Sequence, residues 1–379
     1  MSKENSALRH GSIPDDWTKP IVDPTAFAEE QRRMASVWTF LGMTSDVEKD
    51  GDWFRASIAT RSVFVQRFGT DLRGFENVCA HRFMPLRNAE RGNGPIVCGF
   101  HHWTYDRQGS AVGIPRCREL YDALPQELGA RLARIELATC GRMIFGRFPH
   151  PSASESLEDF LGIGFGILAA GSQAQLKPHY LRIAFQANWR LSAQIGLDDY
   201  HSPAVHPRTF GRYGYIRRQD ISYYRFGLHS AYLYTSKPEG LEQVAQACRD
   251  GTYYPNCYTI LQLVPTASMA FFRTDLDNYH CVVLVYEPVR HDRTIVRAWA
   301  YPAPFPGRRS WARTLSDPVR ASIVKHYVKM VLGEDNLACE RIQGIAHQIG
   351  RPPMLGRLEE RIGWFEDSYR KLMAAREGD

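Results

Sequence analysis

The sequence predicts an α+β protein in which a small antiparallel β module lies between helical and α+β segments. The N-terminal part, 24–40, opens with a proline and carries apolar residues at roughly helical spacing, which predicts a helix. From 53 to about 148, short β-rich runs alternate with turns that contain glycine and aspartate, as is typical of an antiparallel module. Strand-like runs then dominate, and helical signals return from about 309 to the end.

The bulk composition is that of an ordinary globular protein, with 44% hydrophobic and 23% charged residues among 379. A net charge of +6 without a basic run or a recognition motif argues against a nucleic-acid partner. The longest uncharged apolar run, FLGIGFGILAAG, is too short to span a bilayer, and the N-terminus lacks the apolar core of a signal peptide. The eight cysteines do not form a secreted disulfide pattern. We therefore expect a cytoplasmic protein that binds neither membrane nor nucleic acid.

Two cysteine–histidine pairs lie close together in the segment CAHRFMPLRNAERGNGPIVCGFHHW. Cys79 and His81 form a C-x-H pair, and Cys98 and His101 form a C-x-x-H pair. Both pairs follow short apolar runs, so each is expected at a loop tip. Such a set fits one tetrahedral zinc or an iron–sulfur cluster of mixed ligation. Zinc sites usually begin with a tight pair of cysteines, whereas one thiolate and one imidazole in each half suit a two-iron cluster.

A second constellation lies in NWRLSAQIGLDDYHSPAVHP. His201 and His206 are separated by Pro203, so a helix that begins near Trp189 is expected to end near His201, and His206 is expected to follow from irregular chain. Asp198 is expected to share the helix face of His201. Two histidines and one carboxylate on one face of an iron leave positions open for oxygen and substrate.

The carboxylate of such a site must come from elsewhere in the chain. The segment GEDNLACERIQ follows a helical run and carries Glu334, Asp335 and Glu340. By itself it reads as a helix start with acidic residues in the first turn, which is a common pattern. Glu334 and Asp335 therefore remain alternatives, because either of them could also cap the helix.

The first segment resembles the Rieske motif, C-x-H followed by C-x-x-H, and its flanks CAHR and CGFHHWTYDRQGSAVGIP are similar to those of the motif. Phe83 and His102 depart from it, because they stand where glycine is common. The later segments resemble the catalytic half of Rieske non-haem iron oxygenases, the terminal oxygenase (alpha) subunits of the ring-hydroxylating dioxygenase family. Where that family often has Glu-Asn, the chain has Gln194 and Ile195.

The resemblance implies a particular arrangement of domains and cofactors. An all-β Rieske [2Fe–2S] module at 41–150 would be inserted near the N-terminus of a helix-grip-like catalytic domain at 151–379 with a large antiparallel sheet, and the helical segment 1–40 would pack on the catalytic domain. Asp198 would link one subunit's iron site to the Rieske histidine of the neighbouring subunit. The implied ligands are Cys79, His81, Cys98 and His101 for the cluster, and His201, His206 and Asp335 for a mononuclear Fe(II).

The implied activity is that of a terminal oxygenase in a likewise implied homotrimer, with or without β subunits. Electrons from NAD(P)H would arrive through a separate reductase or ferredoxin, because the chain lacks a dinucleotide-binding fingerprint and a plant-type ferredoxin cysteine pattern. A Rieske electron carrier of a membrane complex is disfavoured, because it would be shorter, carry a membrane anchor and lack the histidine pair.

The substrate is expected to be a small organic molecule that is mono- or dioxygenated. Aromatic residues between 218 and 300 favour an aromatic substrate. The alternative is a monooxygenase that acts on an N-methyl or quaternary ammonium compound. The expected pocket walls are the segment around Gln194 and the residues Tyr223, Tyr224, Phe226, Tyr232, Phe271 and Phe272.

Overall fold

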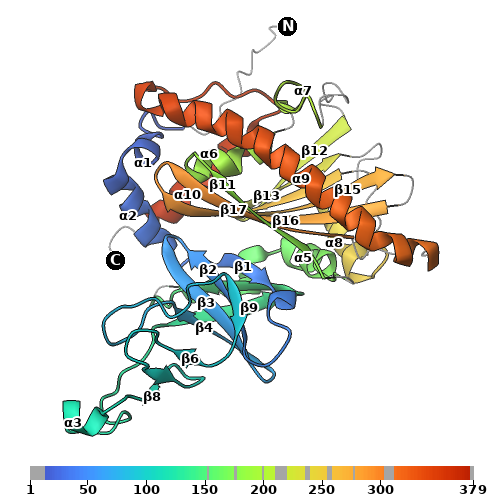
Figure 1. Ribbon diagram of the computed structural model, residues 1–379. Coiled ribbons are helices and arrows are strands. Elements are labelled where there is room, and N and C mark those ends of the chain that lie inside the picture. Colours follow the sequence, from blue (N-terminus) through green and yellow to red (C-terminus); the bar gives the residue numbers. More distant parts are fainter. Residues whose placement is uncertain are drawn as a thin grey trace, which may run out of the picture. The chain divides into compact units, whose positions relative to one another are not determined.

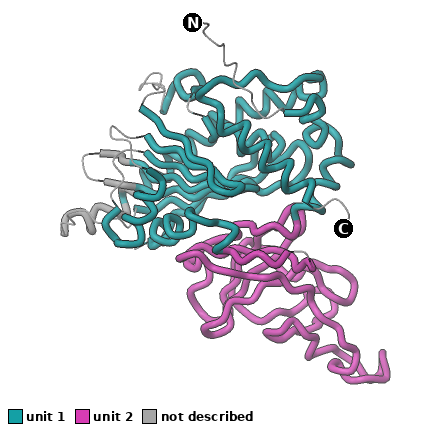
Figure 2. The backbone as a smooth tube through the Cα atoms, turned by 180° about the vertical axis from the view of Figure 1, so that it is seen from behind, with its two compact units in different colours: residues 1–34, 158–379 teal, residues 35–157 magenta. Residues whose placement is uncertain are grey.

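The chain forms two compact units, which Figure 2 shows in different colours. Unit 1 comprises Met1–Met34 and Glu158–Asp379, and unit 2 comprises Ala35–Leu157. The domain boundaries expected from the sequence, after 40 and after 150, differ by a few residues from these unit boundaries at 34 and 157.

A computed structural model describes residues 13–151, 153–174, 177–198, 200–209, 220–234, 240–253, 258–275, 278–302 and 311–375. Among these residues, no helix has both the length and the apolar character needed to cross a bilayer.

Unit 2 is an all-β module with one short α-helix, α3 (Cys117–Tyr121). Its strands are β1 (Thr39–Met43), β2 (Asp52–Ile58), β3 (Arg61–Phe68), β4 (Asp71–Glu76), β5 (Arg91–Asn93), β6 (Ile96–Val97), β7 (Thr104–Tyr105), β8 (Ala111–Gly113), β9 (Arg134–Cys140) and β10 (Met143–Arg147). A seven-stranded sheet has the order β1-β10-β9-β4-β3-β2-β5, and β6, β7 and β8 form a three-stranded sheet. Phe64 and Phe75 lie in an apolar cluster with Cys79 and Cys98, so the cysteine loops rest on a packed core.

Unit 1 is organised around a seven-stranded antiparallel sheet. Its strands are β11 (His179–Phe185), β12 (Ile221–Phe226), β13 (His229–Tyr234), β14 (Tyr258–Leu263), β15 (Ala267–Asp275), β16 (Asn278–Arg290) and β17 (Arg293–Pro302). Strands β12 to β17 pair in sequence order, and β11 pairs with β17 at the other edge. Every second residue of a strand faces the same side of a sheet, so the pairing register decides which side chains can line one cavity.

The helices of unit 1 pack around this sheet. They are α1 (Lys19–Val22), α2 (Pro24–Met34), α4 (Leu157–Leu161), α5 (Gly164–Gly171), α6 (Trp189–Gln194), α7 (Ser202–Val205), α8 (Leu241–Arg249), α9 (Trp311–Ile345) and α10 (Glu360–Ala374). The long α9 crosses one face of the sheet and contacts β11 and β17 (Figure 1). Helices α2 and α10 are also in contact, and the Trp189 ring of α6 lies against Phe365 of α10, with centroids 6.0 Å apart.

The large antiparallel sheet and the all-β module predicted from the sequence are both present, but two helix predictions are wrong. The first helix ends at Met34 instead of 40, because the apolar run that follows enters β1 of unit 2. The segment GEDNLACERIQ does not start a helix, because it lies inside α9. Gly333 opens the segment and Gly344 follows it, and each glycine costs a helix about 1 kcal/mol, too little to end one that is packed along its length.

Candidate functional site

His201, His206 and Asp335 come together in unit 1. The Nε2 atoms of His201 and His206 are 3.3 Å apart, and Asp335 Oδ1 is 3.1 Å from His206 Nε2 and 3.9 Å from His201 Nε2. The point in the plane of these three atoms that is equally distant from them is about 2.0 Å from each, which is the length of a bond between a metal ion and a nitrogen ligand. The three side chains therefore present one ligand atom each around a space of ionic size.

The chain reaches the histidine pair by a route that differs from the prediction. A 3-10 turn follows α6 and ends at Leu197, and Asp198 is extended, with φ −129° and ψ 161°. Asp198 Oδ1 accepts a hydrogen bond from the His201 backbone N–H at 2.9 Å and lies 3.0 Å from His201 Nδ1, as expected of an aspartate that caps a turn instead of continuing a helix. His206 follows one helical turn, α7, and Pro203 occupies its first turn, where proline is tolerated.

Two adjacent carboxylates of α9 contact opposite nitrogens of the His206 ring. Asp335 lies on the Nε2 side, and Glu334 Oε2 is 3.0 Å from Nδ1. Glu334 also accepts hydrogen bonds from Thr209 Oγ1 at 2.7 Å and from the Arg208 backbone N–H at 3.2 Å. Burial alone would raise the pKa of Glu334, but the hydrogen bonds from Thr209 and His206 lower it overall. An ionised Glu334 favours the proton on Nδ1, so Nε2 keeps its lone pair on the side of Asp335.

The four residues of the cysteine–histidine segment lie on two loops of unit 2 with the same backbone pattern. In each loop the cysteine N–H donates to the carbonyl five residues later, at 2.9 Å for both Cys79 and Cys98. The carbonyl of each cysteine accepts from the N–H four residues later, that of Phe83 at 3.1 Å and that of His102 at 3.0 Å. Phe83 and His102 have positive φ angles of 61° and 55°. The two positions where the motif commonly has glycine therefore keep the backbone conformation that favours glycine.

The side chains of these loops bring imidazoles and thiols together. Both cysteines are buried, and the rings of His81 and His101 lie 4.6 Å apart between centroids. The ring of His81 stacks on Trp103 at 4.7 Å and turns its Nδ1 to the inside. Tyr105 Oη lies 3.0 Å from Cys79 Sγ, and burial, followed by the nearby thiol, raises the pKa of Tyr105. Tyr105 therefore stays protonated and can donate to the sulfur.

Both parts of the chain match known families. Residues 37–127 match the Rieske [2Fe-2S] domain, and residues 173–375 match the catalytic domain of the ring hydroxylating alpha subunit. The chain belongs to the ring-hydroxylating alpha-subunit family of Rieske oxygenases. The predicted family is thereby confirmed.

Individual members of this family that resemble the chain differ in their substrates. The large oxygenase component of salicylate 5-hydroxylase from Ralstonia sp is 28% identical over 194 residues, which are 47% of this chain and 45% of that protein. The chloroplastic choline monooxygenase of Beta vulgaris is 25% identical over 260 residues, 64% of this chain and 55% of that protein. The chain thus spans about half the length of the curated relatives it matches.

A solved structure confirms the predicted fold class of this ring-hydroxylating alpha subunit. The crystal structure of naphthalene 1,2-dioxygenase from Rhodococcus sp. bound to indole superposes with a TM-score of 0.76 at 20% identity, and the match covers 98% of this chain and 96% of that chain. At this identity the likeness concerns the fold.

The family implies a Rieske [2Fe–2S] cluster and a mononuclear iron, and the donor atoms of this alpha subunit fit both groups. His81 Nδ1 and Asp335 Oδ1 are buried side-chain atoms that accept no well-aligned hydrogen bond. Buried polar atoms in proteins normally have a partner, so an atom of this kind beside other donor atoms is a good candidate for a metal ligand. Burial, together with the neighbouring His101 and Arg82, lowers the pKa of His81, which favours the neutral imidazole that a metal needs.

A cavity of about 120 Å³ opens beside His201, His206 and Asp335 in unit 1. Its floor is the sheet face that carries Ser268, Ala270 and Phe272 of β15 together with Val282, Leu284 and Tyr286 of β16. Its roof is α9, which contributes Tyr327, Val328, Val331 and Leu332 ahead of Asp335. Among the described wall residues, the only charged or ionisable groups besides tyrosines are Asp198, Asp335 and the two histidines.

Of the six aromatic residues expected to line the pocket, Phe272 is the one found in its described walls. Phe271 is on the opposite side of the sheet, where its ring fills the space beside Gly171. The Tyr223 hydroxyl donates to the Leu358 carbonyl at 2.9 Å. Gln194 contacts Glu366 and does not line the cavity, whereas the neighbouring Ile195 does. Successive strand residues face opposite sides of a sheet, so Phe271 and Phe272 are not expected to line the same cavity. The alternation alone does not show which side of the sheet faces the cavity.

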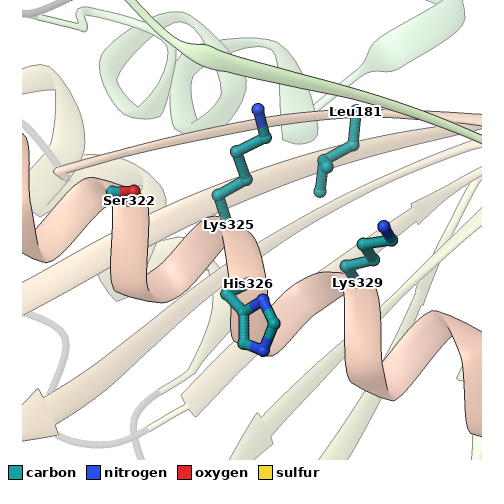
Figure 3. Close-up of a pocket in the computed structure, with 5 residues that line it drawn as sticks. All are labelled: Leu181, Ser322, Lys325, His326 and Lys329. Atoms are coloured by element: carbon teal, nitrogen blue, oxygen red, sulfur yellow. The ribbon is translucent and has the colours of Figure 1, made fainter.

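A second cavity, of about 290 Å³, lies between α9 and β11 and contains none of the predicted site residues. Figure 3 shows Lys325 and Lys329 extending from one side of α9 toward Leu181 of β11. His326 and Ser322 complete its described lining, so this hollow is basic and holds no carboxylate among those residues. It is chemically unlike the cavity beside the histidine pair.

Proposed function

We propose that the chain is a terminal oxygenase that uses O₂ to hydroxylate a small aromatic substrate, by insertion of one or two oxygen atoms. The observation that carries the proposal is the convergence of His201 Nε2, His206 Nε2 and Asp335 Oδ1 at the wall of a mostly apolar cavity. Two histidines and one carboxylate leave coordination positions of an iron open for O₂. When bound, the cluster supplies single electrons, and the mononuclear Fe(II) supplies the position at which O₂ is reduced.

In this proposal each residue of the two sites has a defined part. Asp198 and Glu334 hold the Nδ1 atoms of the two imidazoles, which fixes the ring orientations. The aliphatic side chains of the floor and roof, among them Val282, Leu284, Val328 and Val331, give the substrate an apolar surface. Cys79, His81, Cys98 and His101 hold the cluster, and His201, His206 and Asp335 hold the iron.

An aromatic substrate is supported by the chemistry of the described cavity walls. The floor between the polar groups consists of Ile260, Ala270 and Val282, which offer a flat apolar surface to a ring. A cavity of roughly 150 Å³ holds one benzene molecule, so the observed volume is suited to a single ring. A quaternary ammonium compound would favour an uncommitted carboxylate or a cage of aromatic rings. Asp198 and Asp335 both contact the histidine pair, so the support for this alternative is the set of aromatic rings in the walls, Tyr258, Phe272, Tyr286 and Tyr327.

Metal and sulfide analysis of the purified protein tests the oxygenase proposal. We expect a [2Fe–2S] cluster with acid-labile sulfide and one further iron per chain. O₂ uptake should require NADH, a reductase or ferredoxin, and an aromatic substrate, and NADH alone should support none. Zinc without sulfide would refute the proposal. Turnover of choline or glycine betaine with no turnover of single-ring aromatics would replace the aromatic substrate with the ammonium alternative.

We further propose that the protein works as a cytoplasmic homotrimer in which the iron receives electrons from the Rieske cluster of a neighbouring subunit. The exposed cluster loops support this arrangement, because Phe83 is 77% exposed and Phe100 is 52% exposed beside the His101 ring. Large exposed apolar side chains at a loop tip favour contact with another protein surface. Asp198 is placed on His201 Nδ1, where its carboxylate can also accept a hydrogen bond from a partner's imidazole.

Mixing two inactive chains tests the path of the electrons. One chain carries Cys98→Ser and the other carries His206→Ala, so neither can turn over alone. Hybrid trimers should regain part of the activity, because an intact iron site can lie beside an intact cluster of the neighbour. Asp198→Asn should keep both metals and slow the electron transfer between them. Inactive hybrids next to wild-type controls that reassemble and turn over would show that electrons pass within one chain.

A further inference from the structure

The floor of the cavity has a polar end beside the candidate metal ligands. Ser268 pairs with Leu284 across β15 and β16, so Tyr286 lies diagonally opposite Ser268 on the same face of the sheet. Burial raises the pKa of Tyr286, and the nearby Ser268 hydroxyl offsets part of this increase, so the two hydroxyls are neighbours. Both are more than nine-tenths buried, and both line the cavity. Ser268 and Tyr286 give this end of the floor two adjacent, buried hydroxyls that a polar ligand group could meet.

The Tyr286 hydroxyl lies near the turn that precedes the histidine pair. A Cβ atom added to Gly196 would lie 3.6 Å from Tyr286 Oη, so the hydroxyl is close to the turn that leads into Asp198 and His201. Along β15, Phe272 is four residues from Ser268, a separation of about 13 Å in a strand. The floor therefore runs from a hydroxyl-bearing end near the histidine pair, over Ala270 and Val282, to an aromatic end at Phe272.

The hydrogen-bonding capacity of the pair selects among ligand groups. Two neighbouring hydroxyls, one of tyrosine and one of serine, offer a ligand at least one O–H donor and several acceptor lone pairs. A ligand hydroxyl can use both, because it donates and accepts. A carboxylate cannot donate and would need a cation, and the described cavity walls contain no lysine or arginine. An ammonium group could not accept the remaining O–H.

We propose that Tyr286 and Ser268 form a specificity subsite that binds the hydroxyl group of a neutral, single-ring aromatic substrate and sets which edge of the ring faces His201, His206 and Asp335. This proposal rests on the proposed oxygenase function and adds the substrate class to it. The ring lies over Ala270 and Val282, and Tyr286 Oη and the substrate hydroxyl are hydrogen-bonded. A ring without the hydroxyl should bind more weakly, because it leaves the buried hydroxyls of Tyr286 and Ser268 without a polar ligand atom.

Binding of phenol and toluene to the holoenzyme tests the subsite, because the two probes have nearly the same shape and differ in the hydroxyl. Calorimetric dissociation constants should favour phenol in the wild type. Tyr286→Phe should weaken phenol binding by about tenfold, the ratio that corresponds to one hydrogen bond of about 1.4 kcal/mol, and should change toluene binding by less than about twofold. Ser268→Ala should act in the same direction with a smaller change.

Tyr301→Phe is the matched control, because Tyr301 is a buried tyrosine of the same sheet whose hydroxyl donates to the Gly171 carbonyl at 3.0 Å. It should leave the phenol-to-toluene ratio unchanged even if the protein becomes less stable. A wild type without preference for phenol, or a Tyr286→Phe variant that loses both probes equally, would overturn the subsite. Selective phenol binding without O₂ uptake would keep the subsite and reject the oxygenase function, whereas O₂ uptake without phenol preference would reject the subsite alone.

Discussion

The two candidate metal sites of this chain are built in different ways. In unit 2, the four predicted cluster ligands lie within 79–101, on two loops that share one hydrogen-bond pattern. In unit 1, two histidines on a short turn meet carboxylates of α9, and His206 and Glu334 are in contact across 128 positions of sequence. The first site depends on local backbone conformation, and the second depends on the packing of a long helix over a sheet. Substitutions at the two sites should therefore have separable effects.

The largest effect is expected from loss of an iron ligand. His206→Ala or Asp335→Ala should remove the mononuclear iron and reduce turnover to background, because two remaining protein ligands hold a divalent ion poorly. The visible spectrum of the cluster should be unchanged, because its ligands belong to unit 2. Iron quantification together with absorption spectroscopy measures both outcomes. If Asp335→Ala retained its iron while Glu334→Ala lost it, the carboxylate assignment would be wrong.

A change of similar size is expected at the other site from Cys98→Ser. The serine cannot replace a thiolate ligand of an iron–sulfur cluster, so the visible absorption and the acid-labile sulfide should disappear. The mononuclear iron should remain, because its ligands lie in unit 1. Cys117→Ser is a suitable control, since Cys117 is a buried cysteine of the same apolar cluster and is not among the predicted ligands. Bleaching by both substitutions would indicate general unfolding of unit 2.

A smaller effect is expected from Glu334→Ala, which removes the acceptor on His206 Nδ1 but keeps all three predicted iron ligands. Loss of such an outer partner typically weakens metal affinity 10–100-fold. Iron retention during titration with a chelator measures this change. Glu340→Ala, at an exposed position of the same helix, should behave like the wild type. Equal iron affinity of the Glu334 and Glu340 variants would show that the contact with Nδ1 has no positioning role.

The smallest effect concerns backbone strain in the cluster loops. A residue other than glycine at positive φ is strained by roughly 1–2 kcal/mol, and a glycine loses about 0.5–1 kcal/mol more conformational entropy on folding. Phe83→Gly should therefore stabilise unit 2 by about 0.5 kcal/mol relative to Phe83→Ala, which removes the same ring but keeps the strained φ of 61°. Thermal unfolding of the two variants gives the difference. A less stable glycine variant would show that the loop is not strained.

The sequence predicts the cluster site more fully than the histidine–carboxylate site. The first depends on residues close together in the sequence, and the second depends on how α9 packs on the sheet. The cluster segment could be recognised because spacing within one stretch carries nearly all the information. The histidine pair also stands out in the sequence, and the structure brings it to Asp335, but Asp198 shares no helix face with His201, because its side chain caps the following turn. The roles of Glu334 and Asp335 depend on which nitrogen of His206 each one faces, and only the packing of α9 decides that.

The pocket walls were predicted least well. Ala270, Val282 and Leu284 carry no chemical signal in the sequence, and they reach the cavity because the register of β15 and β16 turns them inward. Nothing in the sequence distinguishes Tyr258, Tyr286 and Tyr327, which line the cavity, from the other aromatic residues. Periodicity gives the two faces of a strand, but the position of α9 determines which face becomes the floor.

The division of the cavity between a sheet floor and a helical roof has a consequence for how such a protein can diversify. Along β14, β15 and β16 the floor uses alternate side chains, so a substitution at Ile260 or Ala270 reshapes the chamber while the backbone pairing is preserved. On α9, by contrast, Tyr327 and Asp335 belong to the same rigid rod, and one inserted residue between them would rotate them by about 100° relative to each other. New substrates can therefore be acquired by substitutions on the floor that leave the spacing between Tyr327 and Asp335 unchanged.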